Sequence, residues 1–239
     1  MLRRIGAGPS VRLACQTRAS GDVAMVPLVP VSGAARPEIG QGREQEIAVL
    51  FADLRNFTTL AERKLPYDVV FFLNRYFEAV ATAIKSAGGV ANQFTGDGVM
   101  ALFGIDTDER DGARRAIAAA QAMAERVDAL SRDLADELAT PLRIGIGIHA
   151  GSAVVGRMGY EDNTYLTAVG DTVHVAARLE QLTKEYRATL VVSERVGVQA
   201  GVDLSAFPRY ELTLRNRNAV LAVRVIEDVT RLHADILRR

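Results

Sequence analysis

Two aspartates in this sequence lie next to apolar runs that are typical of strands. A fold that pairs these strands would bring the two aspartates together. Asp53 ends the run IAVLFAD, and Asp97 lies in the tight turn TGDG between the runs VANQF and VMALFG. Two carboxylates at strand edges can share a pair of hard divalent cations, which is typical of phosphoryl-transfer enzymes. A lone aspartate between glycines is common in turns for conformational reasons, so the prediction depends on the pair.

The elements that must position these aspartates alternate between strands and helices. After a strand over IAVLFAD, Pro66 suits the first turn of a helix, which Gly88 and Gly89 end. The two runs beside Asp97 predict a hairpin. Acidic residues at 106–111 then begin a long alanine-rich helix that ends near Pro141.

The second half of the chain continues the alternation. We expect, in order, a strand at 142–150, a turn at Gly151 and Ser152, a polar arm at 159–168, a helix capped by Asp171 or Thr172, a strand at 188–194 and a hairpin that turns at 216–218. The order strand, helix, hairpin, helix, strand predicts an α/β (α+β) fold with a ferredoxin-like βαββαβ core. Such a core is a mixed sheet with helices on one face.

Composition divides the chain into four parts. Residues 1–31 contain a turn and one proline-bounded extended segment, and residues 32–45 are rich in Gly, Pro and small polar residues, which is typical of a linker. The main domain is expected over 46–227. The tail, 228–239, can form a short helix.

Bulk composition narrows the classes of function. Lys and Arg total 29 and Asp and Glu total 29, so no chain-wide positive field attracts nucleic acid or anionic lipid. No apolar run approaches the roughly 20 residues that cross a bilayer. Cys15 is the only cysteine, which excludes an internal disulfide. We therefore expect a cytoplasmic protein without nucleic-acid or membrane contacts.

Four segments resemble, in the same order, the motifs of class III nucleotidyl cyclase catalytic domains, the family that makes cyclic AMP or cyclic GMP. They are VLFADLRNFT, GGVANQFTGDGVMALFG, LRIGIGIHAG and YLTAVGDTVHVAARLE. The resemblance covers about 46–227. It implies the class III cyclase type of the predicted fold, ATP or GTP as the substrate, and a homodimer with its sites at the subunit interface.

The resemblance also implies roles for residues of this chain. Asp53 and Asp97 match the ligands of two Mg²⁺ or Mn²⁺ ions, with the backbone carbonyl of Leu54 as an addition. Arg178 matches an arginine that stabilises charge on the α-phosphoryl oxygens. The alternative for Arg178 is an exposed helix arginine with no catalytic role.

Two further arginines and two departures, Gln93 and His174, complete the comparison with the family pattern. Arg143 corresponds to a residue that contacts terminal phosphates, and Arg215 is a second candidate for that contact. Gln93 replaces the lysine that specifies adenine, and together with Thr167 it favours ATP without excluding GTP. His174 stands where active members carry an asparagine that holds the ribose. Histidine can donate a similar hydrogen bond, but the replacement predicts low activity.

The segment RLACQTRASGDVAMVPLVP resembles the end of a 2Fe–2S ferredoxin domain, with Cys15 as its last cluster ligand. A cluster needs four thiolates, and the other three cysteines are missing, so no iron–sulfur cluster is expected in this chain. The alternative is an ordinary leader with one free thiol.

Two functions therefore compete. The first is a purine-nucleotide cyclase that converts ATP, or GTP, to the 3′,5′-cyclic nucleotide and pyrophosphate by two-metal catalysis. The second is a catalytically weak or silent cyclase-homology module that serves regulation or dimerisation. Gln93 and His174 favour the second, whereas the paired aspartates favour the first. A diguanylate cyclase or polymerase-palm relative shares the metal pair, but the sequence has no Gly-Gly-Asp-Glu-Phe run and no basic channel.

Overall fold

The structure is a computed structural model that describes residues 42–55, 57, 61, 64–138, 140–160, 163–213 and 220–232. All of these belong to one compact unit, Glu38–Arg239. The segment 1–31 with Cys15, most of the linker, Arg215 and the end of the tail lie outside the described residues. The expectations for them stay predictions.

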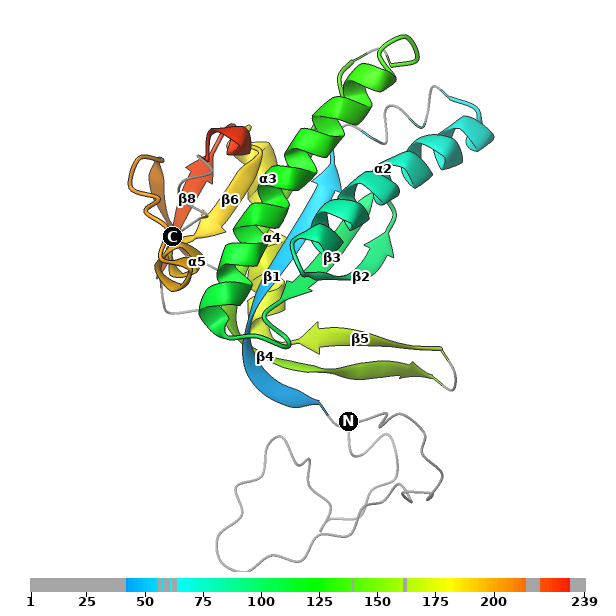
Figure 1. Ribbon diagram of the computed structural model, residues 1–239. Helices are drawn as coiled ribbons and strands as arrows, with labels where there is room; N and C mark the ends of the chain where they lie inside the picture. The colour runs from blue at the N-terminus through cyan, green and yellow to red at the C-terminus, as the bar shows by residue number, and fades with distance from the viewer. Residues whose placement is uncertain are drawn as a thin grey trace, which may run out of the picture. The chain divides into compact units, whose positions relative to one another are not determined.

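In the described part of the chain, eight strands form one mixed sheet (Figure 1) in the order β2-β3-β1-β4-β6-β8-β7, with β5 paired to β4. Only β4 and β6 pair in parallel. The strands are β1 (Arg43–Leu54), β2 (Val90–Thr95), β3 (Gly98–Phe103), β4 (Ile144–Tyr160), β5 (Asn163–Val169), β6 (Leu190–Ser193), β7 (Arg209–Thr213) and β8 (Val220–Ile226). The predicted α/β fold is confirmed.

The described helices are α2 (Pro66–Ser86), α3 (Glu109–Asp133), α4 (Asp171–Glu185), α5 (Glu194–Ala200) and the short 3-10 helix η3 (Val229–Arg231). α2 has the predicted proline in its first turn. The predicted cap of α4 is wrong, because Gly170 precedes the helix and no side chain caps it. Thr172 donates its hydroxyl instead to the backbone oxygen of Ser152 in β4, 2.6 Å away. None of the described helices combines the length and apolar character that a bilayer crossing requires.

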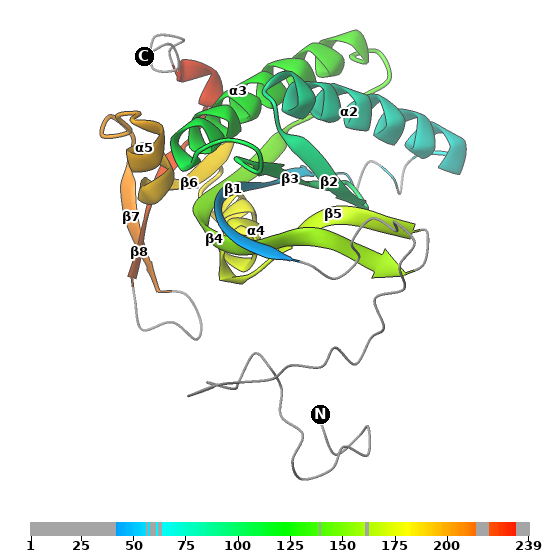
Figure 2. The same cartoon turned by 60° about the horizontal axis from the view of Figure 1, so that its bottom comes forward.

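Helices cover both faces of the sheet, which corrects the expectation of helices on one face. Side chains alternate along β1: Ala48 and Leu50 pack into the core beneath α2 and α3, whereas Ile47 and Val49 share a second cluster with Ala176 of α4. This alternation follows from the two-residue period of a strand. Figure 2 shows α2 and α3 on one side of β1 and α4 on the other.

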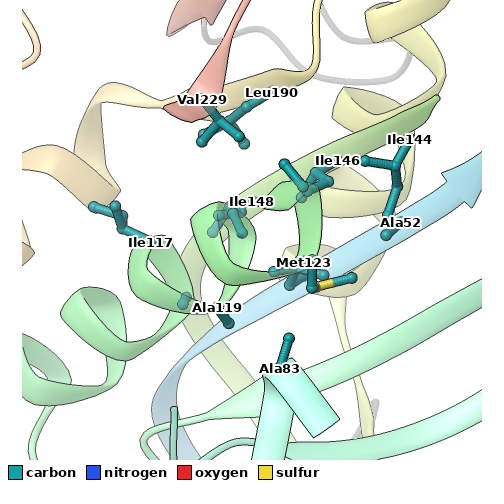
Figure 3. Packing of buried hydrophobic residues seen from close by; sticks show 14 of the residues in the cluster. Ala52, Ala83, Ile117, Ala119, Met123, Ile144, Ile146, Ile148, Leu190 and Val229 are labelled. Carbon is teal, nitrogen blue, oxygen red and sulfur yellow. The ribbon is translucent and has the colours of Figure 1, made fainter. Parts of the chain in front are cut away.

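The core between the sheet and α3 is aliphatic. Figure 3 shows Ile146 and Ile148 of β4 near Met123 of α3, with Ala52 of β1 and Ala83 of α2 close by. All five side chains are buried. This packing fixes the central strands β1 and β4, which carry the candidate site residues at their ends.

β4 is one continuous strand of 17 residues, where the sequence predicted a turn. The two predicted turn residues pair with β1, Gly151 opposite Ile47 and Ser152 opposite Glu46. Beyond them β4 pairs with β5, so the predicted arm at 159–168 belongs to an antiparallel hairpin. In Figure 1 this hairpin extends away from the centre of the sheet.

Gly147 lets α4 lie directly against β4. A Cβ built at Gly147 would overlap the backbone nitrogen of Glu180 and the backbone oxygen of Ala176. Backbone atoms cannot rotate away as a side chain can. The strand and the helix therefore approach each other so closely that only glycine fits at position 147.

Gly147→Ala is therefore expected to lower the free energy of unfolding by about 1–3 kcal/mol, because α4 must move off the sheet. Urea unfolding followed by circular dichroism measures this loss. A variant as stable as the parent protein would contradict the close contact.

Candidate active site

Asp53 and Asp97 lie side by side at one end of the central strands. Asp53 stands opposite Gly98 in the pairing of β1 with β3, and Asp97 immediately precedes Gly98 in the turn. Gly96 in that turn has φ 64°, a left-handed conformation that glycine adopts without strain. Partial burial raises the pKa of Asp97, and the charge and side-chain contact of Asp53 raise it further.

A buried tyrosine from α2 lies near this pair. The Tyr76 side chain is fully buried, and its hydroxyl has no hydrogen-bond partner within the described residues. Burial raises the pKa of the Tyr76 phenol, and the charges of Asp53 and Asp97 add to the effect. A neutral hydroxyl with unused hydrogen-bonding capacity thus stays close to the carboxylates.

The two carboxylates fit divalent cations by their chemistry. Mg²⁺ and Mn²⁺ favour oxygen ligands, and a cation between Asp53 and Asp97 would remove the repulsion that raises the pKa of Asp97. The Leu54 carbonyl, next along β1, is a further oxygen donor for the same ion. Across the described residues there is no cluster of three or more His, Cys, Asp or Glu that could hold a metal, so this pair with Leu54 is the candidate centre.

Two ion pairs connect α4 to Asp53 at the end of β1 and to Arg55 just after the strand. Lys184 Nζ lies 3.2 Å from Asp53 Oδ2. Arg55 NH1 lies 3.3 Å from Glu180 Oε1, with only 13% and 11% of the two side chains exposed. These last two atoms attract as charges but are not aligned as a hydrogen bond. Burial raises the pKa of Glu180, although Arg55 opposes that shift.

The residues predicted to contact the base meet where β2 lies beside β5. Gln93 of β2 donates from Nε2 to the hydroxyl of Tyr165 in β5, at 3.2 Å. Thr167 of β5 is buried and donates to Oδ1 of Asn92, also at 3.2 Å. The structure therefore places Gln93 and Thr167 at the same β2–β5 border, where each forms its own hydrogen bond across the two strands to a residue that the sequence analysis did not identify.

The residues predicted to act on the ribose and the α-phosphate lie on the exposed face of α4. His174 and Arg178 are one turn apart and both exposed. Arg178 donates to Gln181 Oε1 at 3.1 Å and lies 3.5 Å from Glu185 Oε1. Within the described part of the chain, no hydrogen bond or ion pair joins His174 or Arg178 to the two aspartates.

Arg143 precedes β4 and its backbone oxygen accepts a hydrogen bond from the Arg55 nitrogen at 2.7 Å. Its side chain lines a pocket of about 680 Å³ together with Arg55, Lys184 and Arg187. The predicted site residues thus form separate groups within the chain. Asp53, Leu54 and Asp97 form one, Arg143 lines the neighbouring pocket, and the others lie at the β2–β5 border and on the exposed face of α4.

Sequence reasoning missed Lys184, Arg55 and Glu180. Lys184 lies in the last turn of α4, where a basic residue is common because it complements the helix dipole, so its position carried no special signal. The pairing of Arg55 with Glu180 joins residues 125 positions apart. No local pattern indicates such a contact.

Asp97→Asn is expected to raise the melting temperature of the metal-free protein near neutral pH, because it removes the repulsion from Asp53. The pKa of Asp97 is higher in the folded protein than in the unfolded chain, so its charge destabilises the fold above the folded pKa. The gain should disappear as the pH falls through that pKa and Asp97 is protonated.

Thermal unfolding in a chelator at about pH 7 and about pH 4 measures this difference. Asp136→Asn, at an exposed aspartate in the turn after α3, is the control and should change the melting temperature little. A lower melting temperature of Asp97→Asn at neutral pH would contradict the repulsion.

Both the sequence and the fold match known nucleotide cyclases. The adenylate cyclase of Anabaena cylindrica is 33% identical over 172 residues, which are 72% of this chain and 34% of the relative. Adenylate cyclase 1 of Rhizobium meliloti (strain 1021) is 32% identical over 187 residues, 78% of this chain and 28% of the relative. This chain thus spans about a third or less of the length of these curated relatives.

The crystal structure of the guanylyl cyclase Cya2 has a TM-score of 0.69 to this fold at 30% identity, and the match covers 77% of this chain and 93% of that one. Residues 39–221 match the family described as the adenylate and guanylate cyclase catalytic domain. Since that match takes in every strand from β1 to β7 and the four α-helices of the described residues, the chain belongs to this family of cyclase catalytic domains.

Proposed function

We propose that this domain is a purine-nucleotide cyclase that converts ATP to 3′,5′-cyclic AMP and pyrophosphate. The observation that carries the proposal is the close pair of carboxylates, Asp53 and Asp97, at the edge of the sheet. One relative of this chain is named an adenylate cyclase and another a guanylyl cyclase, so family membership does not decide which purine base the substrate carries. Gln93 and Thr167 favour ATP and leave GTP as a second substrate.

Each group of residues has a distinct part in this proposal. Asp53 and Asp97 hold two divalent cations, which when bound lower the pKa of the ribose 3′-hydroxyl and neutralise phosphate charge. The 3′-oxygen then attacks the α-phosphorus, and the bond to pyrophosphate breaks in line. Arg143 binds the terminal phosphates, and Arg178 stabilises the charge that develops on the α-phosphoryl oxygens.

The remaining roles belong to the base and the ribose. Gln93 and Thr167 orient the purine through hydrogen bonds, and His174 donates to the ribose ring. His174 and Arg178 face outward from α4, so we propose that they act on a nucleotide held by the aspartates of a second copy of the chain. Exposed apolar side chains next to the base residues support a covering subunit, since Phe94, Tyr165 and Val169 are 46%, 46% and 52% exposed.

Complementation between two inactive variants tests the proposal. Asp53→Asn removes the metal site and Arg178→Ala removes a transition-state contact, and each alone should lower turnover at least about 10²-fold. Mixed in equal amounts, they should regain about a quarter of the wild-type rate, because half of the dimers then contain one intact site.

The assay measures cyclic AMP and cyclic GMP formation with Mn²⁺ over a range of protein concentrations. Lys85→Gln, a charge change at an exposed residue of α2, is the control for surface effects. Wild-type protein that forms neither product would refute the enzymatic proposal. Activity that the mixture does not restore would refute sites shared between subunits.

The second candidate function is a regulatory or dimerisation module with weak turnover, and His174 is the observation that favours it. If His174 is a poor substitute for the family's asparagine, His174→Asn should raise kcat by about tenfold or more, because it restores an oriented neutral donor. His174→Ala is the matched control and should lower kcat. A rate that is unchanged or lower in His174→Asn would show that histidine performs the role fully.

A further inference from the structure

Lys184 lies between the carboxylate pair and a neighbouring pocket. Its ammonium group is 3.2 Å from Asp53 Oδ2, and the same residue lines the pocket that contains Arg143. The Lys184 side chain is 58% exposed, whereas that of Asp53 is 21% exposed. The lysine is therefore the more solvent-exposed partner of the pair and the aspartate the more buried one.

The pocket beside Lys184 suits a small polar ligand. Its volume is about 680 Å³, in the usual range for small-molecule sites. Cationic, hydroxyl and acidic side chains line it: Arg55, Arg143, Lys184 and Arg187, then Thr183 and Thr189, and finally Asp128, Glu227 and Asp228. Within the described residues, the side chains of Arg143 and Arg187 form no ion pair or hydrogen bond. Two cations are thus available to an anion there.

Arg187 lies in this pocket because of where α4 ends. It directly follows the C-cap residue Tyr186, and its φ of 52° is the left-handed conformation common at that position. The nitrogen of the next residue, Ala188, donates to the Thr183 oxygen at 3.0 Å and closes the helix. The end of the helix therefore places the second of the two unpaired cations.

The net charge around Asp53 decides whether Lys184 stays paired with that carboxylate. In the metal-free protein Lys184 is the cation paired with Asp53, and it also lowers the pKa of Asp97 and of Glu180. An ammonium group supplies one positive charge, while the two carboxylates together carry two negative charges. Once the aspartates hold divalent cations, Lys184 has no anionic partner there and instead experiences repulsion.

We propose that Lys184 exchanges partners: it pairs with Asp53 in the metal-free protein and with the terminal phosphates of the nucleotide in the metal-loaded complex. This inference rests on the proposed function, because it assumes that a nucleoside triphosphate binds beside the metal centre. Arg143 and Arg187 then share the phosphates with Lys184. Because one residue serves both anions, it couples metal binding to nucleotide binding, and each event favours the other.

The first half of the test is metal binding without nucleotide. Mn²⁺ is titrated into Lys184→Gln and followed by electron paramagnetic resonance of the free ion. The variant should bind Mn²⁺ about threefold more tightly, because the lysine no longer competes with Mn²⁺ for Asp53. This factor corresponds to the free energy of a partly exposed ion pair. Lys85→Gln removes the same charge at a distant exposed site and should leave the affinity unchanged.

The second half is nucleotide binding with saturating Mn²⁺, using the non-cyclising analogue adenosine 5′-(α,β-methylene)triphosphate in a calorimeter. Lys184→Gln should bind the analogue about three- to tenfold more weakly, because a charge-assisted contact to phosphate is lost. Lys184→Arg keeps the charge and should retain most of both wild-type properties. A residue with only a structural role would not change the two affinities in opposite directions.

The outcomes separate this inference from the proposed function. Opposite shifts in the two affinities support the exchange. An unchanged Mn²⁺ affinity overturns it, and so does an unchanged analogue affinity or a wild-type protein that binds no analogue. A wild-type protein that binds Mn²⁺ and the analogue, shows both shifts in the variant, and yet forms no cyclic product would refute the enzyme and leave the exchange intact.

Discussion

The close approach of two like charges, Asp53 and Asp97, is the constraint on which the rest of the site depends. The backbone register of β1 and β3 imposes it, because Asp53 stands opposite the residue that follows Asp97. Such a pair is unfavourable without a counter-ion. The buried core beneath α2 and α3 holds the strands in register, and Lys184 supplies a counter-ion. A fold that maintains such a pair is typical of a site that binds a cationic ligand.

The helix α4 serves two purposes at once. Its inner side is fixed to the sheet by the close contact at Gly147 and by the ion pair between Arg55 and Glu180. Its outer side presents His174 and Arg178 to the surroundings. Any shift of α4 against the sheet therefore moves the outward residues and the counter-ion of Asp53 together. This shared support is a physical reason for the two ends of α4 to respond together.

Much of the fold could be predicted from the sequence because its signals are local. Pro66 at the start of α2, the turn around Asp97 and the apolar periodicity of the helices each depend on a few neighbouring residues, and the structure agrees with them. The continuation of β4 through Gly151 and Ser152 could not be predicted, because pairing with β1 about 100 positions away decides it. The helix α4 itself was predicted, but its position on the second face of the sheet was missed for the same reason.

The same distinction between local signals and long-range contacts applies to the candidate site. Motif order was enough to identify Asp53 and Asp97, and the structure places them together. It gave no indication of Lys184, which reaches Asp53 across 131 positions, or of the buried pair of Arg55 and Glu180. Contacts of this kind depend on how helix and strand are packed. Residue type alone does not reveal them.

The uninterrupted length of β1 has a mechanical consequence. From Arg43 to Leu54 the strand is paired with β4 at every position, and it spans roughly 40 Å without a loop. A strand paired along its whole length resists stretching, so a pull applied near Arg43 is transmitted along it toward Asp53. The strand is therefore a direct mechanical connection between the outer end of the domain and the candidate metal-binding carboxylate.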